Sequence, residues 1–175
     1  MDDSSWYFSE YSNSKHAVSS DQMNILRSIV SETVGVSDRG TFMVGSAKVG
    51  CSLSPGQKRF RSFRQDSDID IVVISLRLFA RFWNRLQDVQ RYRNKRLYVK
   101  QIMPSIFRGY INEKPLMCLD KIGNEWLQTF SEAKKRLQNE LGIIHRVSFR
   151  VYRCQEDFER YHLRGIAYLK TKKGI

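Results

Sequence analysis

Residues 69–74, IDIVVI, are the feature that most constrains how this 175-residue chain folds. All but Asp70 are β-branched and apolar. A short run of this kind is typical of a strand that is covered on both faces. Such a strand needs partners at its edges and helices above and below it. We therefore expect an α/β or α+β domain built around residues 69–74.

Periodic patterns predict the elements that flank this strand. Ser19-Ser20-Asp21-Gln22 has the form of a capping box, and the helix behind it is expected to end at Gly35. The alternation in 147–152 predicts a strand whose polar face is exposed or functional. Other segments are expected as a buried strand at 41–44, a loop at 53–67, helices at 76–94, 121–141 and about 155–170, and an irregular stretch at 95–119.

The length suits one domain, which we place at residues 19–175, behind a polar arm at residues 1–18. No apolar run approaches the length of a membrane span, and the first residues do not resemble a signal peptide. The three cysteines and three histidines show no metal-binding spacing. We expect a soluble cytoplasmic protein with free thiols and no membrane partner.

Positive charge is concentrated in the middle of the chain. The formal net charge is +12, and residues 41–110 carry 14 Lys and Arg against 4 acidic residues, a net of +10. A field of this density attracts polyanions such as nucleic acids. A solubilising surface is the alternative explanation.

Two aspartates open the apolar strand. Residues i and i+2 of a strand point to the same face, so Asp68 and Asp70 are expected side by side. Two adjacent carboxylates repel unless a cation lies between them, and Mg²⁺ prefers such oxygen ligands. They therefore predict a site for Mg²⁺ or Mn²⁺, and the alternative is a pair of turn or capping aspartates.

A second motif follows the predicted strand at 41–44. Gly45-Ser46 and the small residues behind it form a turn that lets the backbone approach a ligand, where amide groups can contact phosphate oxygens. A Gly-Ser pair alone is common in ordinary turns. Placed before a strand that opens with Ser-Asp-x-Asp, it becomes a more specific signal.

Together, Val44-Gly45-Ser46-Ala47-Lys48-Val49-Gly50 and Asp68-Ile69-Asp70-Ile71-Val72 resemble the nucleotidyltransferase superfamily of DNA polymerase β type, in particular its small stand-alone bacterial members. The resemblance covers residues 20–90 and leaves 95–175 as a family-specific part. It implies a minimal core with a short mixed sheet flanked by helices. It also implies that Gly45, Ser46 and Lys48 bind the phosphates of an NTP, and that Asp68 and Asp70 hold Mg²⁺ or Mn²⁺ as catalytic residues.

The chain departs from the family pattern in two places. Residues 47–67 form a longer connection than usual, and they carry Lys58, Arg59, Arg61 and Arg64, which we expect to contact phosphate or nucleic acid unless the loop is merely solvated. The superfamily often adds a third carboxylate on a later strand, yet Arg150 stands on the polar face of 147–152. We expect Arg150 to contact phosphate or nucleic acid, and the nearby substitutes for an acid are Asp120, Glu156 and Asp157.

Aromatic residues interleaved with charge add a further expectation. Phe107-Arg108-Gly109-Tyr110 and the rings of Tyr92, Tyr98 and Tyr152 are suited to stacking on bases or single strands, although core packing is the alternative.

The resemblance implies transfer of a nucleotide from an NTP to an acceptor, with Mg²⁺ bound and pyrophosphate leaving. The basic field favours a nucleic-acid acceptor such as tRNA, in the manner of toxin–antitoxin or phage-defence enzymes. The alternative is a catalytically silent module of the same fold that binds nucleic acid or a partner protein. A protein partner that completes or regulates the site is a third possibility.

Overall fold

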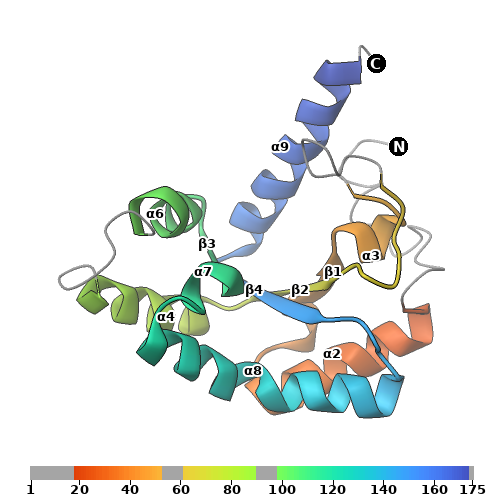
Figure 1. Cartoon of the computed structure of the whole chain (residues 1–175), viewed down its shortest axis with the longest axis horizontal. Helices are drawn as coiled ribbons and strands as arrows, with labels where there is room; N and C mark the ends of the chain where they lie inside the picture. Colours follow the sequence, from red (N-terminus) through yellow and green to blue (C-terminus); the bar gives the residue numbers. More distant parts are fainter. Residues whose placement is uncertain (1–17, 53–60, 90–97, 174–175) are drawn as a thin grey trace.

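The apolar run 69–74 is strand β2 (Ile69–Ile74), and it lies inside a mixed sheet of order β1-β2-β4-β3. The neighbours are β1 (Thr41–Val44), which is antiparallel to β2, and β4 (Val147–Tyr152), which is parallel to it. Strand β3 (Tyr110–Asn112) closes the far edge, antiparallel to β4. The computed structural model describes residues 18–52, 61–89 and 98–173 (Figure 1). The expected α+β architecture with a short mixed sheet is confirmed.

Helices lie on both sides of this sheet (Figure 1). The capping box is present, because Ser19 and Gln22 each bond to the other's backbone amide, and Gly35 ends the helix in the left-handed region. No helix in the described residues is both long and apolar enough to cross a membrane. The helices are α2 (Ser20–Val34), α3 (Ser46–Val49), α4 (Leu76–Val89), α6 (Met103–Phe107), α7 (Glu113–Leu116), α8 (Asp120–Leu141) and α9 (Gln155–Lys173), with a 3₁₀ turn η1 (Asp38–Gly40) and a π-helical turn η2 (Tyr98–Ile102).

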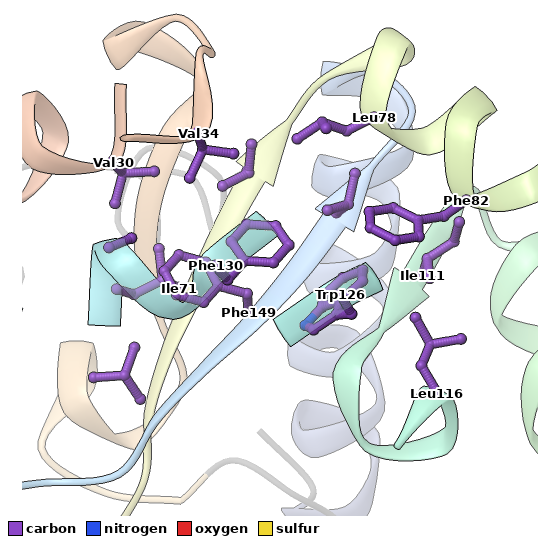
Figure 2. Packing of buried hydrophobic residues seen from close by; sticks show 14 of the residues in the cluster. Val30, Val34, Ile71, Leu78, Phe82, Ile111, Leu116, Trp126, Phe130 and Phe149 are labelled. Atoms are coloured by element: carbon purple, nitrogen blue, oxygen red, sulfur yellow. The ribbon is translucent and has the colours of Figure 1, made fainter. Parts of the chain in front are cut away.

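The main core lies between one face of the sheet and helices α2, α4 and α8 (Figure 2). Ile71 of β2 and Phe149 of β4 are fully buried there. The Phe130 ring of α8 stacks on the Phe149 ring, with 4.4 Å between ring centres. The Trp126 ring of α8 lies against the Phe82 ring of α4, with 4.8 Å between centres. Burial of large side chains from both layers fixes this face of β2 against the helices.

Helix α9 covers part of the opposite face of the sheet. Phe158 of α9 is buried with Val44, Val72 and Tyr152, and it stacks on Phe42 at 5.0 Å. β2 is therefore covered on both faces, as its composition predicts. The polar face of β4 is also partly covered, because Tyr152 is fully buried against α9.

Residues 98–119 contain more order than the sequence predicts. The expected irregular stretch includes η2, α6, β3 and α7, so that interpretation is wrong for residues 98–116. β3 has only three residues, and its pairing with β4 rather than any period of its own makes it a strand. The expected helix at 76–94 is found as far as Val89, and residues 90–97 lie outside the described part.

Candidate functional site

The Gly-Ser turn and Asp70 meet at one end of neighbouring strands. Val44, the last residue of β1, pairs with Asp70 of β2. Gly45 has φ +70°, and a Cβ placed on it would lie 2.9 Å from Asp70 Oδ2. Only glycine fits this backbone conformation at this distance from the carboxylate. Two motifs separated by more than twenty residues are therefore adjacent in the fold.

Ser46 and Lys48 lie directly behind this turn, on the short helix α3. The amides of Lys48 and Val49 bond to the Gly45 carbonyl at 3.1 and 3.2 Å, which closes the turn, and Gly50 ends the helix. Lys48 is half-buried. The turn thus brings its backbone close to Asp70, and Lys48 adds a cationic residue to the same short helix.

The two aspartates differ in exposure. Asp68 is exposed and Asp70 is half-buried, with the fully buried Ile69 between them. Ser148 pairs with Asp70 across β2 and β4, and its hydroxyl donates a 2.6 Å hydrogen bond to Asp70 Oδ1. The Asp70 carboxylate, with Asp68 two residues before it in the chain, offers oxygen ligands of the kind that Mg²⁺ takes together with substrate phosphates.

The proposed substitutes for a third acid lie elsewhere or are already engaged. Asp120 begins α8 and Glu156 lies in the first turn of α9, and both are exposed. Asp157 is buried and accepts from Arg153 Nε at 2.8 Å and Cys154 Sγ at 3.2 Å. In the described part of the chain, no three His, Cys, Asp or Glu side chains are grouped so as to hold a metal ion.

Arg150 lies on the same face of β4 as Ser148, two residues further along. Its guanidinium carbon is 5.1 Å from the centre of the Tyr110 ring and 5.3 Å from that of Tyr161, and Nη1 is 3.5 Å from the Tyr152 hydroxyl. Burial opposes its charge, but Tyr152, Tyr161 and Asp70 together hold the pKa of Arg150 above its ordinary value. Arg150 is a fixed positive charge held between two aromatic rings.

His162 of α9 packs against this group from above the sheet. Its ring contacts the rings of Phe158, Tyr161 and Tyr152. Burial, with the charges of Arg150 and Lys48, lowers the pKa of His162 to about 3. Its imidazole is therefore neutral at physiological pH.

The predicted loop begins and ends beside α3. Ser52 N donates to the Arg61 carbonyl at 2.8 Å and Phe63 N to the Gly50 carbonyl at 2.8 Å, so the residues that flank 53–60 pair as a short ladder. Arg61 forms an ion pair with Asp66 at 3.2 Å, and Arg64 is exposed. Lys58 and Arg59 lie outside the described residues.

The aromatic rings predicted to stack on bases differ in exposure. Tyr98, Tyr110 and Tyr152 are buried, so core packing accounts for them, whereas Phe107 is 92% exposed at the end of α6. Tyr92 lies outside the described residues. Sequence reasoning missed Tyr161 and His162, because no local motif marks either residue. They lie near Arg150 because α9 folds back over the sheet and packs against Tyr152.

No protein-family model matches the chain, and no match was found among the curated proteins or the solved structures compared with it. A functional assignment therefore depends on the residues and geometry of the chain itself.

Proposed function

We propose that this protein is a Mg²⁺-dependent, cytoplasmic nucleotidyltransferase that moves a nucleotide from an NTP to an acceptor, with a nucleic acid such as tRNA as the favoured acceptor. Transfer to a host RNA would suit a toxin–antitoxin or phage-defence system. The observation that carries the proposal is the close approach of the Asp70 carboxylate to Gly45, which leaves no room for a Cβ there. Metal-assisted nucleotide transfer requires a phosphate-binding turn and a cation-binding carboxylate close enough to contact the same triphosphate.

Each part of the site has a role in this reaction. The Gly45-Ser46 backbone would bind the β- and γ-phosphates, and Lys48 would neutralise part of their charge. Asp68 and Asp70 would hold the cation, and Ser148 would fix the orientation of Asp70 through its 2.6 Å bond. Bound Mg²⁺ would offset the negative charge of the phosphates and polarise the phosphoryl group.

Arg150 is the observation that favours the alternative function. A cation on the face where a third acid is expected is also consistent with a catalytically silent module that binds nucleic acid or a partner protein. The enzyme needs Asp68 and Asp70 for nucleotide transfer. The silent module transfers no nucleotide and does not need these two side chains for binding.

Incubation with α-labelled NTPs, Mg²⁺ and a mixture of total RNA and protein separates these functions. We expect label on the RNA with the wild-type chain and none with Asp68→Ala plus Asp70→Ala. The matched control is Asp21→Ala plus Asp88→Ala, which makes the same change in charge at two exposed aspartates away from the turn. Labelling that survives the first double variant would contradict the enzyme assignment.

RNA binding distinguishes the remaining functions if the wild-type chain transfers no label. RNA binding that weakens with salt and persists in the Asp68→Ala plus Asp70→Ala variant would favour the silent module. Copurification of a second protein that restores labelling would instead indicate a partner that completes the site.

A further inference from the structure

The order of strands places three features in sequence across one face of the sheet. Gly45 follows β1, Asp70 lies on β2, and Ser148 and Arg150 lie on β4. Asp70 therefore lies between the Gly-Ser turn and the guanidinium. If the turn binds the β- and γ-phosphates, Arg150 lies on the side of the carboxylate away from the leaving group. In-line displacement requires the acceptor to approach from that side.

The described residues offer two carboxylates for a divalent cation at this place, Asp68 and Asp70, and Mg²⁺ held by one or two carboxylates takes its other ligands from water and substrate phosphates. In that part of the chain, no three His, Cys, Asp or Glu side chains are grouped so as to hold a metal ion. A second dication on the acceptor side would have to lie close to the Arg150 charge, which repels it. Two carboxylates without a third acid therefore suit one cation that substrate phosphates help to hold, and they leave a second cation without carboxylate ligands of its own.

Arg150 is held in a way that suits a preorganised positive charge. Tyr110 and Tyr161 flank its guanidinium at 5.1 and 5.3 Å, and these rings come from β3 and α9. A charge fixed by packing before the substrate arrives needs no reorganisation when negative charge develops. Arginine also offers a planar fork of donors that matches phosphoryl oxygens.

We propose that Arg150 takes the place of a second divalent cation, so that the site binds one Mg²⁺ at Asp68 and Asp70 and uses the Arg150 guanidinium on the acceptor side. The inference rests on the proposed function. In the transfer, the acceptor oxygen forms a bond to the α-phosphorus, and the bond from that phosphorus to the oxygen bridging the β-phosphate breaks. Pyrophosphate leaves with the electron pair, and the acceptor proton passes to solvent. Arg150 stabilises the negative charge on the α-phosphoryl and attacking oxygens.

Equilibrium dialysis of the full chain with Mn²⁺ and a mixture of the four α,β-methylene NTPs tests this directly. We expect one Mn²⁺ ion per protein-bound nucleotide for the wild-type chain. Arg150→Glu supplies a third carboxylate in place of the cation, and we expect two ions per bound nucleotide for it. Two ions on the wild-type chain would overturn the inference.

Substitutions without a new ligand provide the second measurement. Arg150→Met is expected to keep one ion per nucleotide and to lower single-turnover transfer by roughly 100-fold or more, the usual effect of removing one such stabilising donor. Arg150→Lys should recover part of that loss. Transfer by Arg150→Met at the wild-type rate would overturn the inference even if Arg150→Glu fails to fold. A wild-type chain that binds no nucleotide would overturn the proposed function as well, which is a different result from two ions per nucleotide.

Discussion

Glycines with the same backbone conformation carry different constraints in this protein. Gly45, Gly109 and Gly142 all have φ between +63° and +79°. A Cβ on Gly142 would meet open space, while one on Gly109 would overlap the Asp157 carboxylate. The first glycine is required by conformation alone and the second by conformation and space together. Gly45 belongs with Gly109, since Asp70 closes the space beside it.

Gly109→Ala is therefore expected to destabilise the protein more than Gly142→Ala. Both variants lose about 1 kcal/mol because an L-residue is forced into the left-handed region. In Gly109→Ala the methyl group also displaces the buried Asp157 from Arg153 and Cys154, which adds about 1–3 kcal/mol. Urea unfolding of the two variants measures the difference. Equal losses of unfolding free energy would show that Asp157 moves aside without cost.

Among the elements, those with a strong pattern of their own are the ones the sequence predicts. The bounds of β1, β2 and β4 coincide with the expected strands, and α2 begins and ends at its predicted caps. The sequence does not predict β3 and α7, because their order depends on distant partners. Glu113 is the first residue of α7 and follows β3 directly. Its side-chain carboxylate accepts a 3.0 Å hydrogen bond from Phe149 N of β4. No local period in residues 110–116 indicates that contact.

The buried Glu113 joins three elements and gives a prediction at this scale. It accepts from Trp126 Nε1 at 3.2 Å and forms an ion pair with Lys134 Nζ at 2.7 Å. Lys134→Met leaves this carboxylate without its cation, and we expect a loss of about 3 kcal/mol in unfolding free energy. The control is Lys135→Met, at the exposed neighbour, with a change under about 0.5 kcal/mol. Matching losses would contradict a role for the pair.

Packing of α9 on the sheet predicts a pH dependence. His162 has a folded pKa of about 3, so between that value and 6.5 the unfolded chain binds a proton at His162 that the folded chain does not. Stability therefore falls as pH falls through this window, by about 2 kcal/mol from pH 7 to pH 5. The charged groups that act on His162 are Arg150 and Lys48, and both oppose its protonation.

His162→Phe keeps a ring against Phe158 and Tyr161 but cannot titrate. Between pH 7 and pH 5 the unfolding free energy of both proteins is expected to fall. The fall should be smaller for His162→Phe than for the wild-type chain, by about 1–2 kcal/mol. Thermal or urea unfolding at both pH values provides the measurement. Parallel pH profiles for the two proteins would place the titrating group elsewhere.

At the scale of the whole molecule, the candidate site is predictable only in part. Asp68, Asp70, Gly45 and Ser46 stand in two short motifs, and the antiparallel pairing of β1 with β2 brings the motifs together. Arg150 is visible in the sequence as a cation on the polar face of its strand. Its aromatic surroundings come from β3 and α9, which lie on either side of β4 in the chain and meet it only in the fold. Contacts between residues that are distant in the chain produce no periodic spacing in the sequence, so a sequence pattern cannot predict them.

The distribution of charge over the molecule predicts how RNA binding responds to salt. The net charge is +12 and most of it falls in residues 41–110, which include the Gly-Ser turn and both aspartates. If the surface beside the Gly-Ser turn binds RNA, affinity falls steeply with salt, and each lost phosphate contact lowers the slope of log affinity against log salt by roughly 1. Arg61→Gln plus Arg64→Gln should therefore lower the slope by roughly 1–2. Lys121→Gln plus Lys135→Gln removes the same charge from exposed positions on α8, which covers the opposite face of the sheet, and should leave the slope unchanged. Equal slopes for both double variants in filter binding would show that net charge, rather than the surface beside the candidate site, attracts the RNA.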